Sequence, residues 1–335
     1  MQRADGGGLP CYIRNSVMNQ PPIAFLFPGQ GSQAVGMGKE LVEKYSLARD
    51  TFAEADAALG YPLSHLCFEG PEEKLKLTEI TQPAILTVSV AAQRVLAEQG
   101  IHPQYAAGHS LGEYSAHVAA GTLAFFDAVR IVAKRGKYMQ DAVPVGIGAM
   151  AAVLALALGP LEEACNQARQ ETGGTVAPAN INSPDQIVIS GNKAAVERAA
   201  ELAKEKGAKR AIMLPVSAPF HCALMQPAQD RLAQDLRAVQ FSTPAIPVVT
   251  NVDAKLIQDP EQAREALIRQ VTGAVQWVRS IQALVAAGAQ TFVEVGPGKV
   301  LTGLLRQTDR TKTGLNVENE ESLEKTAAAL RAISS

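Results

Sequence analysis

Short apolar runs and longer amphipathic stretches alternate along the chain. Residues 23–27, IAFLF, form a nearly continuous apolar run, as expected for a strand that is buried on both faces. Helical periodicity then dominates to Gly100, and the short approach PQYAA follows. The next segment, GHSLGEYSAHVAAG, is typical of a strand, a sharp turn and a helix that ends near Gly121. This alternation predicts a parallel sheet covered by helices.

A different pattern occupies residues 146–216. GIGAMAAVLAL predicts a strand and PLEEACNQARQ a helix, and TVAPANI and QIVISG predict two strands joined by a turn. NKAAVERAAELAKEKG predicts a second helix and KRAIMLPV a last strand. The order β-α-β-β-α-β is that of a ferredoxin-like unit. We therefore predict an α/β protein with a discontinuous large subdomain, residues 20–145 and 217–335, and an inserted small subdomain, residues 146–216.

The composition excludes several classes of protein. The 335 residues are 47% hydrophobic and 19% charged, an ordinary globular balance, and the net charge of −2 argues against a dedicated nucleic-acid binder. The four scattered cysteines form no CxxC pair and no cluster with histidine, which argues against a disulfide framework or a zinc site. No apolar run approaches the ~20 residues of a membrane span. Residues 1–19 lack the apolar centre of a secretory signal, so we predict a disordered N-terminal extension on a cytoplasmic protein.

Gly108-His109-Ser110-Leu111-Gly112 fits the pattern G-x-S-x-G. A serine on a tight strand-to-helix turn is held in strained geometry with its hydroxyl exposed, and small flanking residues let the backbone pass closely. A serine that only caps a helix between two glycines is the competing interpretation. Because this copy follows a predicted strand and opens a predicted helix, we favour a nucleophile at Ser110.

A serine nucleophile needs a general base, and five histidines are available. His65 and His102 stand in polar or turn-like contexts typical of the surface. His109 lies inside the turn and is expected to point away from the serine, and His117 lies about two helical turns beyond it. His221, at a loop-to-helix junction in SAPFHCALMQPA, is therefore the candidate base.

Several ordered motifs point to one family. GQGSQ, GHSLGEYSA, RGKYMQ, NSPDQIVISG and FVEVGPGKVLTGL together resemble malonyl-CoA:acyl carrier protein transacylases. The resemblance runs from about Ile23 to near residue 310. This family has an α/β-hydrolase-like core that carries a ferredoxin-like subdomain, in agreement with the predicted insert.

The resemblance implies roles for three catalytic residues. Ser110 matches the serine that is acylated, and His221 matches its base. Gln270, in IRQVTGAVQW, matches the residue whose backbone carbonyl orients the histidine.

It also implies how the substrate is held. Gln30 and Leu111 match the residues whose backbone N–H groups form the oxyanion hole. Arg135, in RGKYMQ, matches the arginine that binds the malonyl carboxylate, for which a guanidinium offers a bidentate contact that lysine cannot copy. Asn182 could contact the acyl thioester arm or simply form a turn.

The implied reaction is ping-pong transfer of a malonyl group. Malonyl-CoA acylates the serine, and the malonyl-serine ester then passes its acyl group to the phosphopantetheine thiol of acyl carrier protein, supplying extender units for fatty acid synthesis. The resemblance implies no metal or redox cofactor and a monomer, and the charge and hydropathy described above indicate no nucleic-acid or membrane partner. Phe220, just before the candidate base, is expected to crowd an α-methyl branch and so to favour malonyl over methylmalonyl groups.

Two alternative functions stay open. A serine esterase or thioesterase on the same turn would want an acidic residue between Ser110 and His221 in chain order, and Asp185 is the main candidate. A non-catalytic module that binds a carrier protein is the other alternative. Cys222 could be offered as a rival nucleophile, but a cysteine entering a helix is more often a small buried hydrophobic residue.

Overall fold

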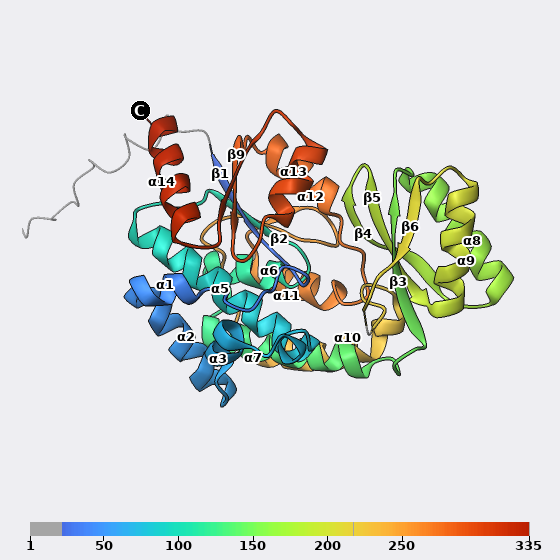
Figure 1. Cartoon of the computed structure of the whole chain (residues 1–335), viewed down its shortest axis with the longest axis horizontal. Helices are drawn as coiled ribbons and strands as arrows, with labels where there is room; N and C mark the ends of the chain where they lie inside the picture. The colour runs from blue at the N-terminus through green and yellow to red at the C-terminus, as the bar shows by residue number, and fades with distance from the viewer. Residues whose placement is uncertain (1–21, 217, 335) are drawn as a thin grey trace, which may run out of the picture.

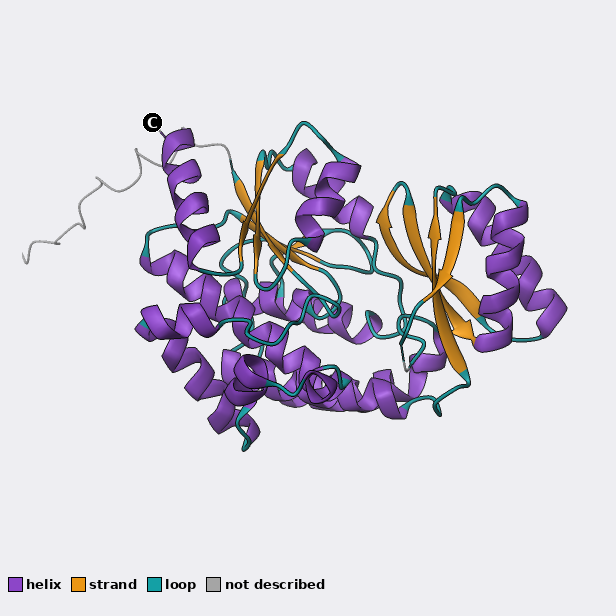
Figure 2. Ribbon diagram, viewed as in Figure 1, coloured by secondary structure: helices purple, strands orange, loops and turns teal. Residues whose placement is uncertain are grey.

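Two β-sheets, each with its own helices, make up the molecule (Figure 1; Figure 2). The computed structural model describes residues 22–216 and 218–334, so the predicted extension 1–19 lies outside the described residues. Within these ranges, no helix has both the length and the apolar character that crossing a bilayer demands.

The larger sheet has six strands in the order β10-β9-β1-β2-β7-β8. Every pair from β10 to β7 is parallel, and β8 returns antiparallel to β7. The strands are β1 (Ile23–Phe27), β2 (Tyr105–Gly108), β7 (Val248–Val249), β8 (Leu256–Ile257), β9 (Thr291–Val295) and β10 (Thr313–Val317). The mixed α/β fold with a parallel sheet, which the sequence predicts, is confirmed.

Both faces of the larger sheet are buried, which explains the continuous apolar run of β1. Phe25 and Phe27 belong to the main core, whereas Ala24 and Leu26 on the opposite face pack with α12 (Trp277–Ala286) and α13 (Val300–Thr308). The other helices that contribute to the main core are α1 (Lys39–Lys44), α2 (Ser46–Leu59), α3 (Leu63–Glu69), α4 (Glu72–Leu75), α5 (Thr78–Glu98), α6 (Gly112–Ala119), α7 (Phe125–Asp141), α10 (Gln226–Ala238), α11 (Pro260–Arg269) and α14 (Glu320–Ser334).

The smaller sheet is antiparallel, with the strand order β4-β5-β3-β6. Its elements follow the predicted order β-α-β-β-α-β: β3 (Gly148–Leu154), α8 (Leu158–Thr172), β4 (Val176–Ser183), β5 (Gln186–Asn192), α9 (Lys193–Glu205) and β6 (Arg210–Met213). Helices α8 and α9 cover the face on the right of Figure 1, and the other face is turned toward the larger sheet. The alternating side chains of β3 follow this division: Ala151 and Val153 pack under the helices, and Met150 and Ala152 face the other way.

A short backbone connection joins the two parts. Asn180 of β4 pairs with Val275, and the N–H groups of Ile181 and Val275 donate to the carbonyl oxygens of Val275 and Ala179 at 2.9 and 2.8 Å. Because Val275 lies just before α12, this bridge fixes the edge of the smaller sheet beside the carboxyl ends of the larger one.

Candidate active site

The loops after three neighbouring parallel strands meet at one edge of the larger sheet. Gln30 follows β1, Ser110 follows β2 and Asn251 follows β7. Ligands of open α/β sheets bind at this carboxyl edge. The side chain of Asn251 joins two of the loops, since its Oδ1 accepts from the Ser110 N–H at 2.7 Å and its Nδ2 donates to the Gly108 carbonyl at 2.7 Å.

Ser110 stands on a strained turn. Its φ of 52° lies in the left-handed region, which serine rarely adopts. The flanking glycines are required by space, because a Cβ on Gly112 would lie 2.0 Å from the carbonyl oxygen of Phe27 and one on Gly108 would lie 1.9 Å from the backbone of Gly112. The sharp turn between β2 and α6 that the sequence predicts is therefore present, with the serine at its tip.

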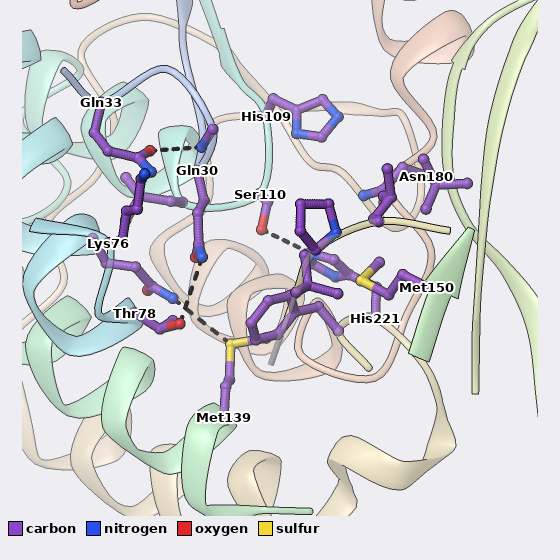
Figure 3. A pocket seen from close by; sticks show the side chains of 18 of the residues that line it. Gln30, Gln33, Lys76, Thr78, His109, Ser110, Met139, Met150, Asn180 and His221 are labelled. Carbon is purple, nitrogen blue, oxygen red and sulfur yellow. Dashed lines mark hydrogen bonds between the residues drawn. The ribbon is translucent and has the colours of Figure 1, made fainter. Parts of the chain in front are cut away.

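His221 lies directly against this serine (Figure 3). Its Nε2 is 2.7 Å from Ser110 Oγ, while its Nδ1 is 2.9 Å from the backbone oxygen of Gln270 and 3.1 Å from that of Gly273. Carbonyl oxygens only accept, so the imidazole hydrogen is on Nδ1 and the Nε2 lone pair faces the serine hydroxyl. Burial first, and then the positive charge of Arg135, lower the pKa of His221 to about 3, which keeps the ring neutral and able to accept a proton.

Arg135 of α7 brings a buried cation to the same serine. Its side chain is only 1% exposed, and its Nη2 donates to Ser110 Oγ at 3.1 Å and to Gln270 Oε1 at 2.8 Å. Nη1 donates to Gln82 Oε1 at 2.8 Å. Burial lowers the pKa of Arg135, and the nearby Tyr114 and Glu113 oppose that shift. A guanidinium held by two neutral amides keeps its positive charge available for a negatively charged group bound beside Ser110.

Two backbone amides beside the serine have no acceptor in the part of the chain that the structure describes. Within the described ranges, the N–H groups of Gln30 and Leu111 donate to no protein atom, and both residues line the cavity that contains Ser110. Leu111 is the residue after the serine, where an oxyanion donor of this kind of turn is expected. The Gln30 side chain points to Thr78, with Nε2 and Oγ1 3.5 Å apart.

The cavity lies between the two sheets and has a volume of about 490 Å³. The large part contributes the loops after β1 and β2 together with the start of α5 and one side of α7, and the small part contributes side chains from β3, β4 and β5 (Figure 3). The lining residues from the small part and the segment after it are Met150, Asn180, Asn182, Val188, Leu214, Pro215, Val216, Phe220 and His221. A ligand that reaches Ser110 thus contacts both parts of the chain.

The other histidines do not contact the serine. His65 and His102 are exposed, as predicted. His109 points away from Ser110: its Nε2 lies 2.8 Å from Asn182 Oδ1, and its ring packs on Trp277 with the centroids 5.4 Å apart. His117 is fully buried in α6, and neither ring nitrogen has a partner among the described residues.

The rival residues also lie away from the reacting pair. Asp185 is exposed at the turn between β4 and β5, and the two backbone carbonyls occupy the place that an acid would take beside the His221 Nδ1. The Cys222 Sγ donates to the Pro219 carbonyl at 3.2 Å, and burial raises the pKa of its thiol. Asn182 lines the cavity, but its side chain is already paired with His109 and with Gln186.

The sequence reasoning missed three polar side chains behind the turn: Gln82, Glu113 and Asn251, each at most 2% exposed. Two signals could have indicated them. Asn251 closely follows a strand that neighbours β2, and Glu113 stands one helical turn after Ser110. Gln82 lies inside α5 among apolar residues and offers no such signal.

Comparisons with known proteins agree on one family. The acyl transferase domain family matches residues 24–326. The chain is 52% identical over 292 residues to the malonyl CoA-acyl carrier protein transacylase of Escherichia coli K12, covering 87% of this chain and 94% of that protein. It is 50% identical over 302 residues to the protein of the same name from Bacillus subtilis, covering 90% and 95%.

Solved structures give the same result. A crystal structure of an acyl carrier protein S-malonyltransferase from Vibrio cholerae superposes with a TM-score of 0.89 at 49% identity, covering 91% of this chain and 99% of that one. A malonyl-transacylase in complex with its type II polyketide acyl carrier protein superposes with a TM-score of 0.89 at 46% identity, covering 92% and 99%.

Proposed function

The chain belongs to the acyl transferase domain family, and within it we propose that this protein transfers a malonyl group from malonyl-CoA to the phosphopantetheine thiol of an acyl carrier protein. It is an acyl carrier protein S-malonyltransferase, as its relatives at about 50% identity are. The reaction proceeds by a ping-pong sequence through a malonyl-serine ester on Ser110. Its product serves as an extender unit for fatty acid synthesis.

The contact of Arg135 with Ser110 is the observation that carries the proposal. A buried guanidinium 3.1 Å from the nucleophilic oxygen suits an acyl group that ends in a carboxylate, because its direct hydrogen-bond partners are neutral and an uncharged acyl chain would bring no anion into contact with it. The same contact argues against an esterase for apolar acyl chains.

In the first half-reaction, His221 Nε2 accepts the Ser110 proton as Oγ attacks the thioester carbon. The N–H groups of Gln30 and Leu111 stabilise the oxyanion of the tetrahedral intermediate. The carbon–sulfur bond then breaks, the proton passes from His221 to the sulfur of coenzyme A, and the acyl group stays on Ser110. Arg135 holds its carboxylate throughout.

In the second half-reaction, the phosphopantetheine thiol gives its proton to His221 and attacks the ester carbon. The same two N–H groups stabilise the second oxyanion. When the carbon–oxygen bond breaks, Ser110 recovers its proton from His221. The backbone carbonyl of Gln270 keeps the imidazole in the required orientation in both halves.

Intact-mass spectrometry tests the proposal. The parent protein and the Ser110→Ala and Cys222→Ala variants are mixed with malonyl-CoA and, separately, with acetyl-CoA. We expect a malonyl adduct on the parent and on Cys222→Ala but not on Ser110→Ala, and loss of the adduct when carrier protein is added. Steady release of coenzyme A without a carrier protein and without an adduct would instead support the serine thioesterase.

Four further features stay predictions from the sequence. They are the cytoplasmic location, the monomeric state, the disordered extension at residues 1–19 and the subdomain boundaries at residues 146 and 216. Size-exclusion chromatography coupled to light scattering measures the oligomeric state directly.

A further inference from the structure

A buried carboxylate lies beneath the strained turn. Glu113 on α6 is fully buried, and its Oε2 accepts from the Asn251 N–H at 3.0 Å and from Gln270 Nε2 at 2.7 Å. Its Oε1 has no partner among the described residues. None of the roles assigned above to the reacting groups uses this side chain.

The contacts of Gln270 give Glu113 its significance. Gln270 Nε2 donates to Glu113 Oε2 and to the Ser110 carbonyl at 2.9 Å, and its Oε1 accepts from Arg135 Nη2 at 2.8 Å. Rotation of the amide by half a turn would set its NH₂ group against the guanidinium, with donors facing donors. The Ser110 carbonyl and Glu113 Oε2 both accept from the present NH₂ group, so both disfavour the rotated form, which would turn the amide oxygen toward them.

We propose that Glu113 is a positioning residue for recognition of the acyl carboxylate: through the side-chain amide of Gln270, it holds the Arg135 guanidinium in the orientation that receives the substrate. The inference rests on the proposed function, since it assumes that Arg135 binds the carboxylate. It adds a side-chain role for Gln270, separate from the backbone contact of that residue with His221.

The protonation state of Glu113 is compatible with this role. Burial raises the pKa of Glu113 to about 7, against the opposing effects of Gln270, Asn251 and Arg135. A proton on the unpartnered Oε1 leaves Oε2 as an acceptor for both of its donors. Glutamine at this position can therefore reproduce both hydrogen bonds, with its amide oxygen in the place of Oε2.

A purely structural role would give a different result from a positioning role. Glu113 also supports Asn251, whose side chain holds the backbone of Gly108 and Ser110. Loss of the Glu113–Asn251 hydrogen bond would disturb the backbone of Ser110 and slow transfer of every acyl group. Loss of the Gln270 orientation would instead weaken the binding only of those thioesters whose acyl group carries a carboxylate.

The experiment compares kcat/KM for malonyl-CoA and acetyl-CoA in Glu113→Gln, Glu113→Leu and the parent, with unfolding temperatures measured in parallel. We expect Glu113→Gln to keep the malonyl-to-acetyl ratio within threefold of the parent. We expect Glu113→Leu to lower that ratio tenfold or more, mainly through a higher KM for malonyl-CoA. An equal loss for both thioesters, or a Glu113→Gln variant as impaired as Glu113→Leu, would overturn the proposal.

Two further variants make the outcome decisive. Gln270→Met removes the side-chain amide and keeps the backbone carbonyl, so it must lower the malonyl-to-acetyl ratio as Glu113→Leu does. In the double variant, Glu113→Leu must lower that ratio no further. This variant carries the test if Glu113→Leu does not fold, and an unchanged ratio in it contradicts the proposal. Arg135→Ala separates carboxylate binding by Arg135 from positioning by Glu113. If Arg135→Ala leaves the malonyl-to-acetyl ratio unchanged, the proposed function of Arg135 fails. If Arg135→Ala lowers this ratio but the Glu113 and Gln270 variants do not, only the role of Glu113 fails.

Discussion

The imidazole of His221 donates its Nδ1 hydrogen to the backbone carbonyl oxygen of Gln270, 2.9 Å away. A carbonyl orients the ring as an aspartate would, but it carries no charge to stabilise the imidazolium. Burial first, and then the positive charge of Arg135, lower the pKa of His221 to about 3, and the hydrogen bonds to the Gln270 and Gly273 carbonyls oppose that shift only in part. The base is thus kept neutral by its surroundings.

The first prediction concerns the pH dependence of the reaction. Because the pKa of the His221 base is far below its ordinary value of 6.5, acidification to pH 5 should not protonate it. The acid limb of the kcat/KM profile for malonyl-CoA should therefore lie below pH 5. Circular dichroism at each pH shows whether the enzyme remains folded. An inflection near 6.5 in folded enzyme would contradict the low pKa.

The second prediction concerns the carboxylate-binding arginine. Arg135→Ala removes at least one hydrogen bond to a charged group, worth about 1.5–3 kcal/mol, so kcat/KM for malonyl-CoA should fall by at least roughly 10- to 100-fold. The value for acetyl-CoA should fall much less. Arg130→Ala is the matched control, since Arg130 is exposed on the same helix and stacks on Phe126. Equal losses for both thioesters would show that Arg135 does not recognise the carboxylate.

The third prediction concerns an α-methyl branch on the acyl group. Phe220 lines the cavity beside His221, and a smaller residue there would leave room for a methyl group. Phe220→Ser should increase kcat/KM for methylmalonyl-CoA relative to malonyl-CoA. One methyl group in a pocket is worth ~1–3 kcal/mol, so the increase should be about 10-fold and at most about 200-fold. An unchanged preference in steady-state assays with both thioesters would rule out Phe220 as the cause.

The fourth prediction compares two glycines. Gly112→Ala would place a Cβ 2.0 Å from the Phe27 carbonyl oxygen, so the turn must move and transfer should be lost together with several kcal/mol of stability. Gly303 lies in α13, where an added Cβ would meet no atom of another segment within 4 Å. Gly303→Ala should therefore raise the free energy of unfolding by up to about 1 kcal/mol and leave the transfer rate unchanged. Urea unfolding and initial rates check both. A fully active Gly112→Ala would show that the turn tolerates a side chain.

The fifth prediction concerns acid stability. Burial lowers the pKa of His117 from 6.5 to about 3, so between these values the unfolded chain binds more protons than the folded one. The destabilisation that His117 causes is therefore small above pH 6.5 and grows as the pH falls. It reaches about 2 kcal/mol at pH 5.

Replacement of His117 by leucine should flatten the decline in unfolding free energy between pH 7 and pH 5 and leave transfer intact. The substitution should be tolerated at pH 7, because it removes two buried ring nitrogens that have no partner among the described residues. The slope that His221 contributes is common to both proteins and cancels in the comparison. Parallel curves from urea titrations would mean that His117 is protonated or hydrated in the folded state.

The sequence predicted the elements whose patterns are strong. The run at Ile23–Phe27 and the turn around Ser110 follow from burial on two faces and from the space that the glycines leave. The strand β10 and the helix α14 were not predicted. At the sheet edge the strand alternates poorly, since most of its residues, Thr313–Asn316, are exposed or half-buried.

The candidate site divides in the same way. Spacing and elimination led to Ser110 and His221, but the Gln270 carbonyl contact could come only from the resemblance, because a backbone interaction leaves no trace in side-chain identity. Glu113 and Asn251 were missed for a related reason. They bind one another and the turn from within the core, and a buried polar network has no periodicity that a sequence pattern could detect.

The backbone angles of the reacting pair have an evolutionary consequence. Ser110 and His221 both have positive φ, 52° and 58°, a conformation that costs about 1–3 kcal/mol for a residue with a side chain. Glycine at either position would relax the chain and remove the reacting group, so thermostability and turnover oppose one another there. Selection for thermostability alone would favour glycine at these two positions, and only the loss of activity opposes it. Stabilising substitutions should therefore be made at other positions, for example at Val145, which is apolar, 80% exposed and has no role in transfer that stability would oppose.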